Sequence, residues 1–221
     1  MTDGEYTLPV GCFGTPGSYS YRAMKEHFAG KSIEPTYYGQ FADLVQAVAN
    51  GTVRYGVLPI ENSTTGGITE VYDLIHRLNC HIVGEKYVKV EHHLLTIPGT
   101  RLEDIHTVYS HPQGLAQCQK YLKQHPNWIL QPYFSTSQSA QFVQHEQRHD
   151  IAAIANSTAA EMYGLTMLEC NINDNHTNFT RFFVIAPQAE DIEGADKITL
   201  VLTVHHAPGA LYHVLGHFFY N

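Results

Sequence analysis

A hydroxyl and a guanidinium stand side by side at Thr180 and Arg181, within an otherwise apolar run. An arginine in apolar surroundings needs a carboxylate, which it binds through two parallel hydrogen bonds. That carboxylate belongs either to a ligand or to the protein itself, for example to Glu61, and in the second case the pair only supports a strand. Adjacent strand residues face opposite sides of a sheet, so Thr180 and Arg181 reach one ligand only near a strand end or a bulge.

Two polar loops hold further candidates for binding an anionic, hydroxylated small molecule. In residues 14–20, glycines let the backbone approach a ligand, and Ser18 can cap a helix whose first N–H groups face an anion. Residues 59–67 combine Glu61 and Asn62 with three hydroxyl groups and a glycine pair. Capped helix starts explain the hydroxyl groups of both loops, but they do not require Glu61 and Asn62 together.

A third polar loop places Ser110 and His111 between an expected strand and an expected helix that begins near Pro112. Gln113 and Gln117 are four residues apart and share one face of that helix, where both can line a binding site. His111 can titrate near neutral pH. The alternative is structural: Ser110 caps the helix and His111 is a surface residue.

Composition narrows the classes of function. The 221-residue chain has a formal net charge of −8 without a Lys/Arg cluster, which argues against a nucleic-acid partner. The acidic N-terminus has no apolar signal core, and no apolar run is long enough to span a membrane. Four scattered cysteines fit free thiols in a reducing compartment, so we expect a cytoplasmic protein. The 15 histidines include no set at metal-ligand spacing, so no metal is expected.

Apolar β-prone runs alternate with helical patterns, which is typical of an α/β sandwich with largely parallel sheets. The first part of the chain predicts strands at residues 6–13, 33–38 and 55–59, and helices at 18–28, 41–49 and 68–78. The β-prone stretch 81–97 then crosses into a second lobe. That lobe predicts strands at 105–110, 128–132 and 151–155, and helices after Pro112, at 137–145 and at 157–163. A strand at 179–185 returns to the first lobe, and beyond an acidic spacer a strand at 197–204 and a helix at 208–219 follow.

Taken in order, these motifs resemble the prephenate dehydratase family over roughly residues 10–185. The matching segments are Gly17-Ser18-Tyr19-Ser20, Leu58-Pro59-Ile60-Glu61-Asn62-Ser63, Ser110-His111-Pro112-Gln113 through Gln117-Cys118, Ala152-Ala153-Ile154, Ala159-Ala160, Tyr163-Gly164-Leu165, and Asn178 with Thr180-Arg181-Phe182. The ordered set is far more specific than any one motif.

The resemblance implies a fold and a domain organisation. Residues 1–190 would form an α/β catalytic region of two lobes like type II periplasmic binding proteins, with the active site between them. The first lobe would take about 1–80 and 178–190, and the second about 81–177. Residues 197–221 look like the first β-α unit of a ferredoxin-like ACT regulatory domain, with regulatory residues Pro208, Gly209, Ala210 and Leu211. The rest of that domain is absent from this sequence, which puts feedback control by an L-phenylalanine effector in doubt.

The resemblance also implies an activity, the conversion of prephenate to phenylpyruvate, water and carbon dioxide in phenylalanine biosynthesis, by a homodimer or homotetramer. Gain of an aromatic ring drives this reaction, so a lyase of this kind needs no cofactor. Thr180 is expected at the leaving hydroxyl, and Asn62, Glu61 and His111 are the other expected catalytic residues. A neighbouring acid or water, acting through His111 or Glu61, would supply the proton. The expected substrate-binding residues are Ser18, Tyr19, Ser63, Ser110, Gln113, Gln117, Asn178, Arg181 and Phe182, of which Arg181 binds a carboxylate and Phe182 excludes water.

Two alternatives remain open. An arogenate dehydratase carries out the same chemistry on a substrate with an amino group in place of the keto oxygen. A non-catalytic sensor built like a binding protein would bind prephenate or phenylalanine without making product. Binding alone does not need the hydroxyl of Thr180, which favours the enzyme.

Overall fold

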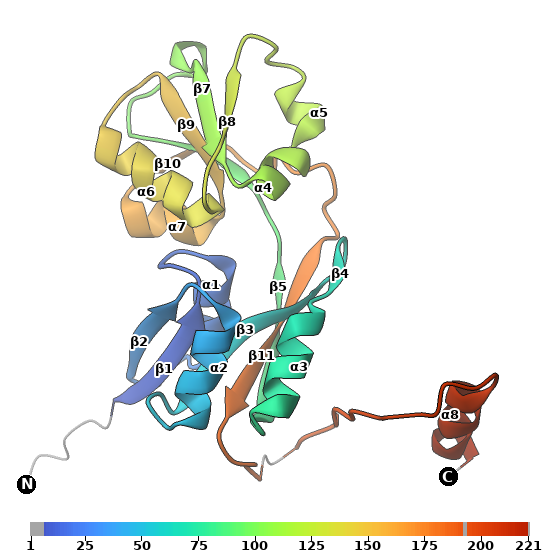
Figure 1. The fold of residues 1–221 in the computed structure, drawn as a ribbon. Helices are drawn as coiled ribbons and strands as arrows, with labels where there is room; N and C mark the ends of the chain where they lie inside the picture. The colour runs from blue at the N-terminus through green and yellow to red at the C-terminus, as the bar shows by residue number, and fades with distance from the viewer. Residues whose placement is uncertain (1–6, 192–193, 221) are drawn as a thin grey trace, which may run out of the picture. The chain divides into compact units, whose positions relative to one another are not determined.

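The computed structural model describes residues 7–191 and 194–220, and residues 1–190 form a unit built on two sheets (Figure 1). The first sheet has the order β2-β1-β3-β11-β5, with β4 beside β3. Its strands are β1 (Leu8–Phe13), β2 (Ile33–Tyr38), β3 (Tyr55–Asn62), β4 (Gly66–Gly67), β5 (His81–Lys89) and β11 (Phe179–Ala186). β1 pairs in parallel with β2 and β3, whereas β11 runs antiparallel to both of its neighbours, β3 and β5.

Three helices complete the first lobe: α1 (Tyr19–His27), α2 (Phe41–Ala49) and α3 (Thr69–Arg77). Alternation along β11 separates two cores on the two faces of the sheet. Phe182 and Val184 pack in the core that includes residues of α1, while Phe183 and Ile185 pack in the core that includes residues of α2 and α3. All four side chains are at most 1% exposed, which explains why this strand reads as a continuous apolar run in the sequence.

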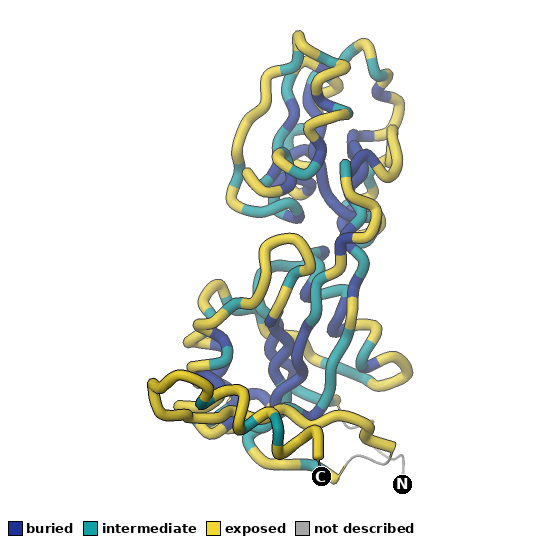
Figure 2. The backbone as a smooth tube through the Cα atoms, turned by 90° about the vertical axis from the view of Figure 1, so that its right-hand side faces the viewer, coloured by how far each residue is buried: buried dark blue, intermediate teal, exposed yellow. Residues whose placement is uncertain are grey.

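The second sheet has the order β10-β6-β9-β7-β8. Its strands are β6 (His93–Thr96), β7 (Thr107–Ser110), β8 (Ile129–Pro132), β9 (Ile151–Ala155) and β10 (Thr166–Glu169), and its helices are η1 (Leu102–Asp104), α4 (Pro112–Ala116), α5 (Gln119–Leu122), α6 (Thr136–Glu146) and α7 (Ser157–Tyr163). Every residue of β9 is buried, because two separate cores cover its two faces (Figure 2).

Most predicted elements of residues 1–190 are confirmed, and β2, α2, β9 and α7 have the predicted bounds. The prediction of largely parallel sheets is wrong, since both sheets are mixed: β11 is antiparallel in the first, and β6 is antiparallel to both of its neighbours in the second. The predicted lobe boundary at residue 81 is also displaced. β5 belongs to the first sheet, so the chain enters the second lobe only after Lys89.

Residues 191–221 form a separate small unit. Its helix α8 (Ala210–Tyr220) confirms the predicted helix at 208–219. The predicted strand at 197–204 is wrong, because these residues carry no strand assignment and no β-pairing. A strand is held by hydrogen bonds to a neighbouring strand, and here the apolar side chains of Ile198 and Val201 are 82% and 61% exposed instead. No helix in the described parts of the chain has the length and apolar character required to cross a membrane.

Candidate active site

Thr180 lies on β11 directly opposite Asn62, the last residue of β3. The Nδ2 group of Asn62 donates a hydrogen bond to Thr180 Oγ1 at 2.9 Å. A hydroxyl that accepts this bond keeps its own proton for another acceptor. Thr180 is half-buried, so its hydroxyl can donate that proton to a small molecule beside the strand.

The backbone that follows Asn62 fixes which way its carboxamide faces. Asn62 Oδ1 accepts hydrogen bonds from the N–H groups of Thr64 at 3.0 Å and Thr65 at 3.3 Å. Backbone N–H groups can only donate, so the oxygen must face them and the NH₂ group must face Thr180. Gly66, with a φ of +85°, closes the turn that returns the chain beside Asn62.

Asn178 completes a network of neutral polar groups around Thr180, and it is only 3% exposed. Its Oδ1 accepts from Asn62 Nδ2 at 2.9 Å and from Ser63 Oγ at 3.1 Å. Ser63 Oγ in turn accepts from the backbone N–H of Phe179 at 3.0 Å. The structure therefore brings together four of the predicted residues, although Ser63 and Asn178 direct these bonds to protein groups, and their contact with substrate stays a prediction.

Arg181 is held by carboxylates of its own chain. Its Nε and Nη2 atoms lie 2.8 and 2.7 Å from Glu85 Oε2, and its Nη1 lies 3.7 Å from Glu61 Oε2. The guanidinium carbon is 5.0 Å from the ring centre of Phe183, a residue of the core against α2 and α3. These contacts fit the structural alternative, in which an ion pair supports the strand. The binding of a substrate carboxylate by Arg181 stays a prediction, and it would require Glu85 to give way.

Sequence reasoning missed Glu85 as the main partner of Arg181. Glu85 stands on β5, 96 residues earlier in the chain, and the strand order that places it opposite Phe183 is not written in any local pattern. Glu61, the partner that the sequence did suggest, has a side chain that is 49% exposed and stands opposite Arg181 on β3.

The third polar loop shows a different division of roles from the one predicted. Ser110 is fully buried and its Oγ donates to the carbonyl of Ile154 at 2.7 Å, so it joins the ends of β7 and β9. His111, not Ser110, caps α4, because its Nδ1 accepts from the backbone N–H of Gln113 at 3.2 Å. Gln113 is exposed, whereas Gln117 contacts a buried histidine, His92, at 2.8 Å between Gln117 Oε1 and His92 Nε2. The substrate contacts predicted for these residues stay predictions.

The loop after β1 confirms the predicted cap. Ser18 Oγ accepts from the backbone N–H of Tyr21 at 3.2 Å. This cap satisfies one of the first N–H groups of α1, which have no acceptor within the helix. The hydroxyl of Tyr19 donates to the carbonyl of Glu91 at 2.7 Å and lies 3.2 Å from His92 Nδ1, and the ligand contact predicted for Tyr19 stays a prediction. Burial raises the pKa of Tyr19 well above its ordinary value, so this phenol remains neutral.

The same loop also contacts the second lobe. Thr15 Oγ1 lies 2.7 Å from Ser137 Oγ at the start of α6, and the hydroxyl of Tyr163 donates to the carbonyl of Pro16 at 3.1 Å. Gly17, with a φ of +76°, packs so closely on α7 that an added Cβ would lie 3.2 Å from Ala159 Cα. No local pattern in the sequence predicts that Ser137 and Tyr163 contact this loop.

Phe182 is 1% exposed and lies in the core that includes residues of α1. Its ring is enclosed by protein in this structure, and the expectation that it excludes water from a bound substrate stays a prediction. Side chains alternate between the two faces of the sheet along β11, so Phe182 and Phe183 lie in different cores. Arg181 contacts the ring of Phe183, not that of Phe182, which follows it directly in sequence.

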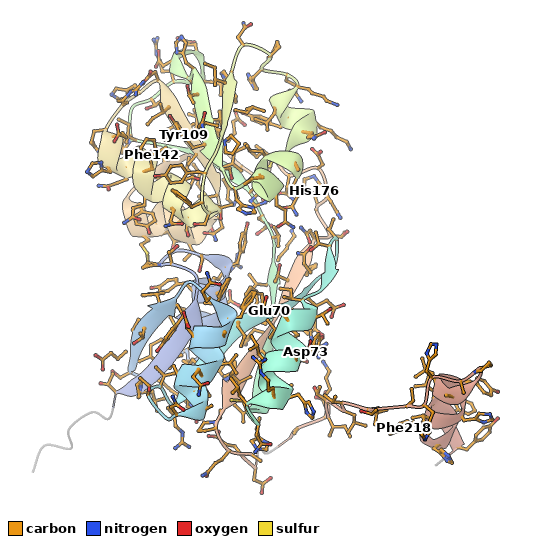
Figure 3. The ribbon with its side chains drawn as sticks, viewed as in Figure 1. Glu70, Asp73, Tyr109, Phe142, His176 and Phe218 are labelled. Atoms are coloured by element: carbon orange, nitrogen blue, oxygen red, sulfur yellow. The ribbon has the colours of Figure 1, made fainter. Side chains whose placement is uncertain are left out.

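A hollow of about 330 Å³ lies elsewhere, on the second lobe. Its lining residues are Tyr133, Phe134, Gln138, Gln141, Phe142 and His145. Figure 3 shows Phe142 beside Tyr109, and their ring centres are 4.8 Å apart. None of the lining residues is a predicted site residue, so the predicted site between the lobes stays a prediction. Among residues 7–191 and 194–220, no group of three or more His, Cys, Asp or Glu side chains could hold a metal ion.

The two mixed sheets define a two-lobed α/β protein, and the chain connects the lobes after β5 and again before β11. The hydrogen-bond network of Thr180 and Asn62 lies at the start of β11. The profile of prephenate dehydratase matches residues 10–190, and the chain therefore belongs to the prephenate dehydratase family.

Relatives of known sequence agree with this assignment. The bifunctional chorismate mutase/prephenate dehydratase of Escherichia coli K12 is 35% identical over 214 residues, which make up 95% of this chain and 55% of that protein. Arogenate dehydratase 5 of Arabidopsis thaliana is 37% identical over 217 residues, 96% of this chain and 51% of that protein. The chain thus spans about half the length of the curated relatives it matches.

Solved structures show the same fold. A prephenate dehydratase from Arthrobacter aurescens in complex with L-Phe has a TM-score of 0.79 and 26% identity, covering 96% of this chain and 72% of that one. A protein described as a novel type of quorum quenching acylase, GqqA, has a TM-score of 0.78 and 30% identity, covering 96% of this chain and 77% of that one. The fold alone is therefore compatible with more than one chemistry.

Proposed function

We propose that this chain is a lyase that converts prephenate to phenylpyruvate, water and carbon dioxide, with Thr180 assisting the departing hydroxyl. The observation that carries the proposal is the bond from Asn62 Nδ2 to Thr180 Oγ1, which leaves the hydroxyl proton of Thr180 available to a ligand. Family membership supports the reaction, since the chain matches prephenate dehydratase over residues 10–190.

The proposed step balances without an electron carrier. The bond between the ring and its carboxylate breaks and releases carbon dioxide, and its electron pair enters the ring as the bond to the hydroxyl group breaks. Loss of these two groups completes the aromatic ring, and the departing hydroxide takes a proton and leaves as water. Thr180 stabilises the developing negative charge by hydrogen bonding, because a threonine hydroxyl is too weak an acid to lose its proton at neutral pH.

The proton itself must come from a stronger acid or from water. We assign this part to water near Glu61, whose side chain is 49% exposed and lies close to the same strand end. His111 is a weaker candidate, because its Nδ1 is engaged as the cap of α4.

We assign the carboxylates of the substrate to the start of α1. The first N–H groups of this helix have no partner within it, and the Ser18 cap holds them in place. We assign Arg181 a supporting part through Glu85, because its short contacts are with that carboxylate.

The test is the appearance of phenylpyruvate by absorbance after prephenate is added, with Thr180→Ala compared with Thr180→Ser. Loss of one hydrogen-bond donor to the developing negative charge should lower kcat by about 10²–10³-fold in Thr180→Ala, with a smaller change in KM. Thr180→Ser keeps the hydroxyl and should retain most of the activity. Turnover of Thr180→Ala near the wild-type rate would exclude this residue from the reaction.

Arogenate is the competing substrate, and the plant relative named arogenate dehydratase supports testing it. The two compounds differ at one position of the side chain, where an amino group replaces the keto oxygen. A ratio of kcat/KM above 1 for prephenate over arogenate supports the proposal, and a ratio below 1 favours arogenate dehydratase. Binding of either compound without product would instead identify a sensor.

An acylase activity, suggested only by the description of one structural relative, has less support here. An acylase that uses threonine as its nucleophile needs a base in contact with the hydroxyl. Within the described residues, the side-chain partner of Thr180 Oγ1 is the amide of Asn62, which donates and cannot accept a proton.

We further propose a cytoplasmic homodimer or homotetramer, with L-phenylalanine as an effector if the ACT domain is complete. All four cysteines are free thiols, which suits a reducing compartment. The relative from Arthrobacter aurescens in complex with L-Phe supports the choice of effector. Pro208, Gly209, Ala210 and Leu211, at the start of α8, remain the proposed regulatory residues. Calorimetric titration with L-phenylalanine and light scattering would test the two points.

A further inference from the structure

A buried histidine, His92, joins side chains from both lobes. It stands between β5 and β6, where the chain passes from the first sheet to the second, and it is 2% exposed. Its Nδ1 lies 3.2 Å from the hydroxyl of Tyr19, the first residue of α1. Its Nε2 lies 2.8 Å from Oε1 of Gln117, the residue that ends α4.

The backbone around His92 is held as firmly as its ring. Its N–H donates to Asn173 Oδ1 at 3.1 Å, and its carbonyl accepts from the N–H of Ile172 at 2.9 Å. Asn173 also donates to the carbonyls of Asn175 and Val90, at 2.6 and 3.5 Å. The imidazole therefore has little freedom to turn away from Tyr19 and Gln117.

The hydrogen-bond roles at Nδ1 follow from the proton of Tyr19. The phenol has one proton, and it donates that proton to the carbonyl of Glu91 at 2.7 Å. Toward His92 the phenol oxygen can then only accept, so the Nδ1 of His92 carries a proton.

The roles at Nε2 follow from the burial of the ring. A second proton there would make a buried cation, and burial lowers the pKa of His92. A neutral ring with Nδ1–H has a bare Nε2, which needs a donor. The two ends of a carboxamide have the same shape, so a half-turn of Gln117 brings its NH₂ group to Nε2 at the same distance.

We propose that His92 is a positioning residue, which accepts a hydrogen bond from the carboxamide of Gln117 and so presents the carbonyl oxygen of Gln117 to the substrate. Tyr19 holds the other nitrogen, which ties the orientation of Gln117 in the second lobe to α1 of the first. This inference rests on the proposed function and on the contact with the substrate that the sequence predicts for Gln117.

The kinetic test compares two substitutions that each keep half of the imidazole's bonding. His92→Gln keeps a polar atom near the position of Nε2, so kcat/KM should stay within about threefold of the wild-type value. His92→Asn keeps a polar atom near the position of Nδ1 instead, so kcat/KM should fall about tenfold, the equivalent of one hydrogen bond. His93→Gln is the matched control: His93 is 6% exposed, and its Nδ1 accepts from the N–H of Asn171, away from Gln117.

A double-mutant cycle separates positioning from plain stability. If His92 acts through Gln117, then adding His92→Asn to Gln117→Ala should change kcat/KM by less than about twofold. Losses that multiply, to roughly a hundredfold in the double variant, would overturn the proposal. Melting temperatures of all variants, measured alongside, show which of them are folded.

A spectroscopic readout works on the unmodified chain and needs no activity. In ¹⁵N-labelled full-length protein at pH 7, the ring of His92 should be neutral with its proton on Nδ1. A proton on Nε2 alone, or on both nitrogens, would refute the arrangement. If the wild-type protein consumes neither prephenate nor arogenate, the proposed function fails, but this measurement still decides whether His92 accepts from Gln117.

Discussion

Replacing Asn62 with aspartate should disable Thr180 while changing almost nothing in shape. The change removes the NH₂ group that donates to Thr180 Oγ1 and Asn178 Oδ1, both at 2.9 Å, and puts an acceptor there. The N–H groups of Thr64 and Thr65 still hold the other oxygen in place. Thr180 would then donate its proton to the new carboxylate, so the proton would no longer be available to the departing hydroxyl of the substrate.

The size of the effect follows from the bonds involved. The hydrogen bond to Asn178 is lost, the one to Thr180 is reversed, and an acceptor is left facing the buried Oδ1 of Asn178, so the free energy of unfolding should fall by about 1–3 kcal/mol. The catalytic loss should be larger than this suggests, because the proton of Thr180 is redirected away from the substrate, and kcat should fall by about 10²–10³-fold. Protonation of the new carboxylate would restore a donor, so the relative activity of Asn62→Asp should rise as the pH falls.

The assay is the absorbance of phenylpyruvate over a range of pH, with urea unfolding in parallel. Asn62→Ala serves as the control, since it removes the donor without adding an acceptor and should show no recovery at low pH. If Asn62→Asp keeps kcat within a few-fold of wild type while remaining folded, the orientation argued for Thr180 is wrong.

Two further predictions concern stability. Glu85→Gln removes the charge from the main contact of Arg181, whose side chain is 24% exposed. In urea titrations at low salt, this change should lower the free energy of unfolding by about 1–2 kcal/mol. The KM for prephenate should change little, and a large rise in KM would instead indicate a direct part in binding. Burial also lowers the pKa values of His27, His92 and His93 below their ordinary value of 6.5. Below pH 6.5 the unfolded chain therefore binds protons that the folded chain excludes, so the free energy of unfolding should decrease as the pH falls from 6.5 toward 5, and a flat profile over that range would contradict these shifts.

Local patterns predicted the elements of this fold well, but they did not predict how the strands pair. The bounds of β9 and α7 could be read directly, since an apolar run bounded by a helix cap is a local signal. The antiparallel setting of β11 could not, because strand direction depends on contacts across more than a hundred residues. β10 was missed altogether: three of its four residues are exposed, so it lacks an apolar pattern.

The candidate site divides in the same way. Asn62, Ser63 and Thr180 were found because polar groups at the ends of apolar strands stand out in the sequence, and the structure brings them together. The partners of Arg181 and Tyr19 were not found, since they lie 96 and 73 residues away. The burial of Phe182 was not predicted either, because its position next to Arg181 in sequence does not show which face of the sheet it occupies.

The position of β11 in the first sheet has a consequence for how the chain is made. This strand lies between β3 and β5, yet it is synthesised about ninety residues after β5 and even longer after β3. A nascent chain that ends before residue 179 therefore exposes one edge of β3 and leaves β5 without its partner strand in this sheet, and such unpaired strands are prone to pair with other chains. Residues 90–177 are contiguous and contain every strand of the second sheet. The second lobe can therefore fold before β11 has been synthesised and the first sheet has been completed.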